Sequence, residues 1–175
     1  RSQLIENFSL ERVNTSPASF DPKKLWTVQD HYMQQLSTAE KLGLMMPFLL
    51  KAGLVTEPVT DEIKSLVAQI IEASGDRLKV AGDILIYATF FLVEELTLDP
   101  AAVTKRLAKP GTAELLRQFI EHVEAVEPFH PETLEAALKS VVENAGKKVG
   151  DLIHPVRVAV TGTTVGPGLY DCLAI

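Results

Sequence analysis

Signals for the start of a helix recur along this chain, and they constrain its fold more than any other feature. An aspartate, serine or threonine repeatedly stands just before an apolar stripe of helical spacing, where its side chain can accept hydrogen bonds from the free amides of the first turn. Ser37 and Glu40 also form a capping-box pattern. The predicted caps are Asp21, Ser37, Thr60, Asp76, Asp99 and Thr112. The sequence therefore predicts an all-α helical bundle.

Breaks between the stripes set the expected extents of the helices. Residues 13–20 are expected to form a loop, and a short helix is expected before them. The run from Ile84 to Val93 is too apolar to be amphipathic, so its helix is expected at the centre of the bundle. VRVAV at 156–160 follows a proline, and we expect a short helix there, with a strand as the alternative. The other expected helices cover 22–36, 38–51, 60–73, 76–95, 101–107, 112–123 and 131–145.

The charge of the chain is unevenly distributed. Its 175 residues fit one or two small domains, and their net charge of −6 argues against a generic basic nucleic-acid clamp. Residues 114–143 carry a balance of −5, whereas residues 144–175 carry +1. An RNA-binding face is therefore expected only near the C-terminal end. No apolar run has the length of a membrane span, and the start of the chain does not resemble a signal peptide.

The sequence lacks the residue clusters that usually carry out chemistry. Its four histidines are scattered without a partner at helical spacing, so we expect no metal site. Nucleotide-binding glycine patterns are also missing. Cys172 is the only cysteine and lies in an apolar run, which predicts buried packing in a reducing compartment. We expect this chain to perform no catalysis by itself.

The stretch from His154 to Ile175 has the most unusual composition. Its first apolar run contains Arg157 and ends at Thr161-Gly162, and Gly-Pro-Gly at 166–168 leads into a second apolar run. Glycine allows positive φ and close approach of another molecule, while proline fixes φ and removes a donor. These residues predict a corner between two short helices. Their chemistry alone favours a structural role in which Arg157 binds backbone carbonyls at a helix end.

The same residues resemble a known signature. PVRVAVTG at 155–162, followed by GPGLYDCLAI at 166–175, is similar to the C-terminal pattern of bacterial-type glutamyl-tRNA synthetases. That pattern reads Pro-Leu-Arg-x-Ala-Leu-Thr-Gly, then Pro-x-Leu and an aromatic residue, and this chain has valine at both leucine positions before the glycine. The resemblance implies an all-helical anticodon-binding domain. It also implies that the anticodon-loop site is lined by Arg157, Pro167, Leu169 and Tyr170.

Two further positions resemble this family. SFDPKKLW at 19–26 is similar to its Phe-Asp-x-x-Lys-Leu element, which implies a contact between Lys24 and the tRNA backbone, although Thr27 stands where the family has tryptophan. Arg77 stands near the place of an arginine that reads the last anticodon base in some members, and an arginine fork suits a base edge. The alternative for Arg77 is a solvated residue in the first turn of the helix expected over 76–95.

The resemblance implies that the chain is the C-terminal portion of a glutamate–tRNA ligase. Residues 1–52 would form a helical, stem-contact-like connector, and residues 53–175 an anticodon-binding domain cut at its C-terminal end. A catalytic domain of the same polypeptide would bind ATP and Mg²⁺, and this portion would hold no cofactor. The implied partner is tRNA-Glu, with tRNA-Gln left open, in the cytoplasm. A monomer is favoured.

Two other classes of function stay open on this sequence. The net charge and the acidic faces favour a helical protein-interaction module. A synthetase paralogue that has lost its activity would carry the same motifs. The salt dependence of binding distinguishes the interaction module from an RNA-binding domain. Counterion release makes RNA affinity fall steeply as salt rises, whereas the affinity of apolar helix docking has no such dependence.

Overall fold

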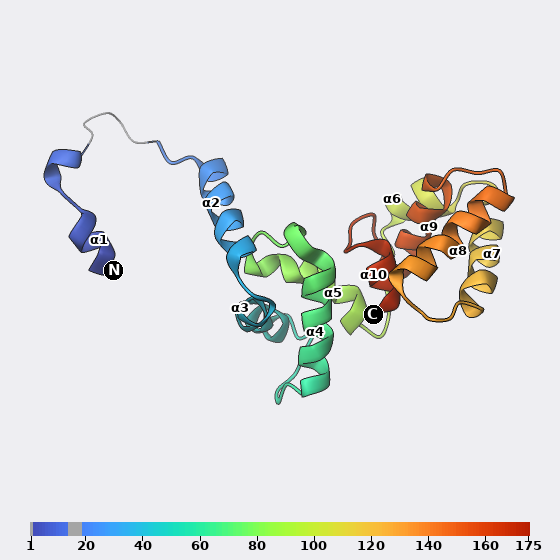
Figure 1. The fold of residues 1–175 in the computed structure, drawn as a ribbon, viewed down its shortest axis with the longest axis horizontal. Coiled ribbons are helices and arrows are strands. Elements are labelled where there is room, and N and C mark those ends of the chain that lie inside the picture. Colours follow the sequence, from blue (N-terminus) through green and yellow to red (C-terminus); the bar gives the residue numbers. More distant parts are fainter. Residues whose placement is uncertain (1, 14–18) are drawn as a thin grey trace.

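The structure of the protein is a computed structural model that describes residues 2–13 and 19–175. These residues form helices and no strand, so the predicted all-α class is confirmed. The α-helices are α1 (Ser2–Asn7), α2 (Pro22–Gln35), α3 (Thr38–Lys51), α4 (Asp61–Ser74), α5 (Ile84–Leu92), α6 (Pro100–Ala102), α7 (Thr112–Glu124), α8 (Pro131–Asn144), α9 (Gly150–Thr161) and α10 (Leu169–Ala174). The 3-10 turns η1 (Leu10–Arg12), η2 (Gly75–Arg77) and η3 (Ala81–Asp83) and the π turn η4 (Val103–Leu107) complete the elements. Figure 1 shows that α2–α5 and α6–α10 form two lobes.

Side-chain caps explain where several of these helices begin. The carboxylate of Asp21 accepts hydrogen bonds from first-turn amides of α2, and Ser37 with Glu40 forms the predicted capping box of α3. Thr60 and Asp99 cap α4 and α6 in the same way. Each contact satisfies an amide that has no partner inside the helix, and each contributes about 1 kcal/mol. The predictions of these helix starts are confirmed.

The prediction of one long helix over 76–95 is wrong about where that helix begins and ends. The α-helix in this region, α5, begins only at Ile84, and a loop with the turn η3 precedes it. The carboxylate of Asp83 accepts hydrogen bonds of 2.8 and 3.0 Å from two backbone amides of that loop, which hold it in a non-helical path. Arg77 consequently lies in η2, directly after α4, and not in the first turn of a long helix.

Two other local expectations are settled by the backbone. Residues 156–160 lie within α9, so the short helix expected there is confirmed and the strand alternative is wrong. The N-cap of α7 is Gly111, with a φ of +82°, and Thr112 is instead the first helical residue. The loop expected over 13–20 lies mostly outside the described residues.

Each lobe is built around its own hydrophobic core. In the N-terminal lobe, α3, α4 and α5 pack together, while α7, α8, α9 and α10 enclose the core of the C-terminal lobe. Burying one such side chain contributes about 1.5–3 kcal/mol. The first core takes residues from both sides of residue 52, and the domain boundary expected there stays a prediction. Fully or almost fully buried members are Met45, Leu49, Val67, Ile70, Ile71, Ile84, Leu138, Val141, Val142 and Leu152.

The C-terminal end of the chain connects the two lobes. The amide of Gly168 donates to the carbonyl oxygen of Ala73 at the end of α4, at 3.3 Å. The amide of Asp99 donates to the carbonyl oxygen of Gly162, at 2.8 Å. Ile175 packs against the N-terminal core, and in Figure 1 α10 lies on the side of the C-terminal lobe that faces the N-terminal lobe. The corner between α9 and α10 is therefore placed at the lobe junction.

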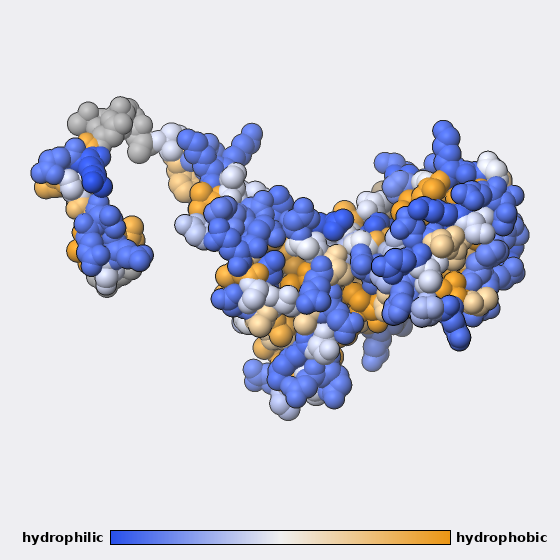
Figure 2. Space-filling model, viewed as in Figure 1, coloured by the Kyte–Doolittle hydropathy of each residue, from blue (hydrophilic) through white to orange (hydrophobic). Residues whose placement is uncertain are grey.

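The outer surface is largely polar. Figure 2 shows hydrophilic residues over most of the visible face of both lobes, with smaller apolar areas between them. Among the helices of residues 2–13 and 19–175, none is both long enough and apolar enough to cross a membrane. Leu25, Val28 and Tyr32 leave an apolar side of α2 exposed.

Candidate nucleic-acid interface

Residues 162–168 form the corner between α9 and α10, and Arg157 holds this corner together. Its Nη1 atom donates a hydrogen bond of 2.8 Å to the carbonyl oxygen of Pro167. Burial lowers the pKa of the Arg157 guanidinium, and the positive charge of Arg77 acts in the same direction. The guanidinium stays charged at neutral pH because its ordinary pKa is so high. Arg157 thus has the carbonyl-binding role that the chemistry of the corner favours.

Two glycines of the corner permit this arrangement. Gly162 has a φ of +75°, and a Cβ atom added there would lie 2.3 Å from the carbonyl oxygen of Thr97. A Cβ atom added at Gly166 would lie 2.9 Å from Nη1 of Arg157. Gly162 must therefore be glycine for the backbone at Thr97, just before α6, to approach it. Gly166 must lack a side chain to leave room for the guanidinium of Arg157.

Three other residues predicted to contact RNA lie at or beside the corner. Pro167 and Leu169 are buried, so they pack the corner and offer little open surface. Arg77 is exposed, and its Nη1 atom donates to the carbonyl oxygen of Ser74 at 3.4 Å. The exposed part of the corner is its tip, residues 163–165, which carries two threonine hydroxyls.

The remaining two predicted contacts lie elsewhere. Tyr170 packs against the C-terminal core, where burial, followed by the charge of Glu135 on α8, raises the pKa of its hydroxyl. Glu135 is paired with Lys139, whose charge acts on the Tyr170 pKa in the opposite direction. Lys24 is exposed on α2, which Figure 1 shows well away from α9 and α10. The RNA-binding roles of all six residues stay predictions.

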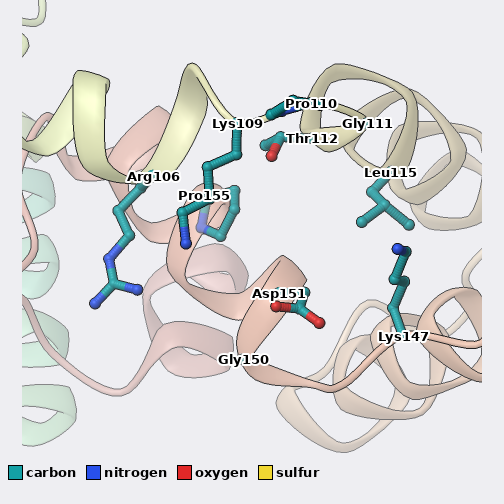
Figure 3. Close-up of a pocket in the computed structure, with 10 residues that line it drawn as sticks. All are labelled: Arg106, Lys109, Pro110, Gly111, Thr112, Leu115, Lys147, Gly150, Asp151 and Pro155. Atoms are coloured by element: carbon teal, nitrogen blue, oxygen red, sulfur yellow. The ribbon is translucent and has the colours of Figure 1, made fainter.

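A second polar feature, the cationic pocket, opens on the C-terminal lobe. We define it by Arg106 of η4, Lys109 of the loop before α7 and Lys147 of the loop before α9, which line a cavity of about 160 Å³. Figure 3 shows Lys109 and Lys147 reaching towards this cavity from opposite sides, with Asp151 between them and Arg106 at its edge. Three separate segments of the chain therefore contribute positive charges to the rim of this cavity.

The cations of this pocket are not neutralised by ion pairs. Within residues 2–13 and 19–175, the salt bridges are Lys64–Asp61, Lys79–Asp30, Arg117–Glu114 and Lys139–Glu135. Asp151 is the acidic residue that lines the pocket, and its carboxylate accepts a hydrogen bond of 3.1 Å from the amide of Lys148. The Nε atom of Arg106 is buried without a hydrogen-bond partner.

The sequence did not single out these cations. Lys109 directly precedes Pro110-Gly111, and Lys147 contributes to the positive charge balance of residues 144–175. That local excess of positive charge was the one available signal. The convergence of the three side chains depends on how η4, α7 and α9 pack, which no local pattern describes.

Other groups that could carry chemistry do not gather anywhere in the described part of the chain. It holds no cluster of three or more histidine, cysteine, aspartate or glutamate side chains with the arrangement of a metal site. Cys172 is buried as predicted, and burial raises the pKa of its thiol to about 11. The features that remain for function are the corner, with Arg77 beside it, and the cationic pocket.

Comparisons with solved structures agree with the fold. A crystal structure of a glutamate tRNA ligase from Elizabethkingia meningosepticum superposes with a TM-score of 0.78 at 24% identity, covering 99% of this chain and 33% of that chain. The glutamate-tRNA synthetase of Elizabethkingia anophelis gives a TM-score of 0.74 at 22% identity. This likeness shows that the all-α arrangement is an established fold.

Sequence comparisons identify the family. The chain is 32% identical over 173 residues to the glutamate–tRNA ligase of Moorella thermoacetica, and 35% identical over 175 residues to that of Roseiflexus castenholzii. Both alignments cover 99% of this chain but only 35% and 34% of the relatives, so the chain spans about a third of their length. The predicted resemblance to glutamyl-tRNA synthetases is thereby confirmed. A family profile described as an anticodon binding domain matches residues 23–175, and the chain belongs to that family.

Proposed function

We propose that this chain binds the anticodon arm of tRNA-Glu as part of a glutamate–tRNA ligase. The observation that carries the proposal is the match of residues 23–175 to the anticodon binding domain family, supported by relatives that are glutamate–tRNA ligases. Another part of the polypeptide would activate glutamate with ATP and Mg²⁺ and transfer it to the tRNA in the cytoplasm. This chain would contribute recognition and no cofactor.

The lobe junction has the chemistry that recognition of an RNA loop requires. Proteins read single-stranded RNA by bonding to the edges of unstacked bases, and an arginine fork can bond two acceptors at once. Arg77 is exposed at this junction, and the tip at 163–165 adds the hydroxyl of Thr164, since that of Thr163 is bonded to the backbone of Val165. Because Arg157 already donates to Pro167, we assign the first contacts to Arg77 and the tip, and a supporting role to Arg157.

The distribution of charge gives the RNA a preferred side of the C-terminal lobe. The outer surfaces of α7 and α8 are acidic, and their exposed cations Arg117 and Lys139 are paired with glutamates. The cations of η4 and of the loops before α7 and α9 have no such partners in the described residues. An RNA that follows the positive side would therefore pass along α9 and reach the corner.

Binding to two labelled RNAs tests this proposal. One is the anticodon stem-loop of tRNA-Glu, and the other is the acceptor-stem minihelix of the same tRNA. We expect the chain to bind the stem-loop more tightly in fluorescence anisotropy. Its affinity should fall steeply as salt rises from about 50 mM to about 200 mM, because phosphate contacts release counterions.

The outcomes separate the open classes of function. Equal affinity for the two RNAs would contradict anticodon-arm recognition and would indicate a generic basic surface. No binding to either RNA, at any salt concentration, would contradict the proposal as a whole. Apolar docking to a protein, with little dependence on salt, would then favour the helical interaction module.

A further inference from the structure

We propose that the cationic pocket of Arg106, Lys109 and Lys147 binds a phosphate group of the RNA backbone. The inference rests on the proposed function, because the bound RNA supplies the phosphate. It places a second contact on the C-terminal lobe, away from the base-reading corner. Phosphate contacts fix the position of a protein on an RNA without reading its bases.

The pocket is assembled by packing and does not result from a run of basic residues. The turn η4 packs against α9, which places Arg106 beside Pro155 at the edge of the cavity. Lys109 lies in the loop between η4 and α7, and Lys147 lies in the loop between α8 and α9. The backbone positions of the three residues are therefore fixed around the cavity by packed helices. An anion bound in the cavity would be attracted by the positive charges around it.

Arg106 contributes a guanidinium at the edge of the pocket. It is half-buried, its Nε atom has no hydrogen-bond partner, and it has no salt bridge within the described residues. A buried donor without a partner destabilises the protein until a ligand or water satisfies it. The planar guanidinium bonds phosphate oxygens in pairs, which makes arginine the usual residue at such sites.

The start of α7 adds to the positive character of the pocket. This helix has 13 residues and begins at the pocket with Gly111 and Thr112, and its N-cap provides no side-chain hydrogen bond. The positive end of the helix dipole therefore faces the cavity without a capping side chain. Asp151 opposes this field, and its carboxylate is engaged by the amide of Lys148, while Glu114 in the first turn of α7 is paired with Arg117.

The pocket and the corner are connected along α9. His154 and Arg157 are three residues apart on this helix and so lie on the same side of it. Burial lowers the pKa of His154, and the next causes are the charges of Arg106 and then Arg157. His154 therefore lies near both charges, on the helix that runs from the pocket to the corner.

Charge-neutral variants of the two exposed lysines test the pocket. In the double variant Lys109→Gln/Lys147→Gln, we expect affinity for a tRNA-Glu transcript to fall about tenfold at low salt, because charge-assisted bonds to phosphate are lost. The slope of log affinity against log salt should become shallower by about one for each phosphate contact removed. The matched control is Arg117→Gln/Lys139→Gln, which removes the same charge from the acidic side of the lobe.

The measurements are fluorescence anisotropy over a series of salt concentrations, with thermal unfolding of every variant. An equal loss in the pocket and control variants would overturn the pocket and leave RNA binding intact. A wild-type chain that binds no tRNA would overturn the pocket together with the proposed function. A titration with inorganic phosphate forms the second arm. Phosphate binding that the pocket variant loses, with tRNA affinity unchanged, would assign the pocket to free phosphate and overturn the RNA contact.

Discussion

The corner and the cationic pocket both lie along α9, but they use their polar groups in opposite ways. In the corner, the Arg157 guanidinium is bonded to Pro167, and the carbonyl of Gly162 is bonded to Asp99. In the pocket, Arg106 and Lys109 have no ion-pair partner among the described residues. The region that carries the sequence signature thus serves the fold first. The region without a signature keeps more of its charge available for a ligand.

Among substitutions that test this difference between the corner and the pocket, we expect the largest loss of stability at Gly162. Replacing it with alanine forces a side chain into positive φ and against the Thr97 carbonyl oxygen, at 2.3 Å. Backbone strain and the clash together should lower the free energy of unfolding by about 3 kcal/mol. Thermal or urea unfolding measures this loss.

Gly146 offers a matched control for that substitution. It also has a positive φ, of +63°, but no atom lies within 4 Å of an added Cβ. Gly146→Ala should therefore cost only the conformational strain, about 1 kcal/mol. Equal losses at the two glycines would show that the contact between Gly162 and the α6 segment does not organise the corner.

An intermediate effect is expected at Arg157. Arg157→Ala removes the hydrogen bond to the Pro167 carbonyl oxygen, and we expect a loss of about 2 kcal/mol in unfolding free energy. Arg117→Ala is the control, since this exposed arginine sits in a surface ion pair and should cost less than about 1 kcal/mol.

The same Arg157 variant decides between the two roles of the corner. RNA affinity measured per folded molecule should change little if Arg157 supports the loop from inside. A fall in affinity of roughly 10- to 100-fold with unchanged stability would instead place its guanidinium on the RNA, as the family resemblance implies.

The last effect is absent at neutral pH and concerns the buried thiol of Cys172. Burial raises its pKa from 9.0 to about 11 in the folded chain, so the protonated thiol is the form that folding favours. Its contribution to stability is therefore complete below pH 9 and is lost as the pH rises from about 9 towards 11. Cys172→Ala should remove this part of the pH dependence. Parallel stability curves for the two proteins in urea would show that the thiol is not buried.

Local rules predicted most of the secondary structure. The caps at Asp21, Ser37, Thr60 and Asp99 act on amides within three residues, so they could be recognised from spacing alone. The same rule was wrong at Asp76. There the carboxylate of Asp83 binds loop amides and delays the helix, a competition that a cap pattern does not reveal.

For the candidate site too, local sequence predicted some features, and the packing of distant segments determined the others. The sequence by itself determined an all-α fold, a corner at residues 162–168 and the family resemblance, because these depend on residues that are close together in the chain. Only the tertiary structure decided that Pro167 and Leu169 are buried, that Tyr170 turns towards α8, and that the pocket cations converge. Burial and convergence depend on which helix faces pack together, and residues far apart along the chain determine that packing.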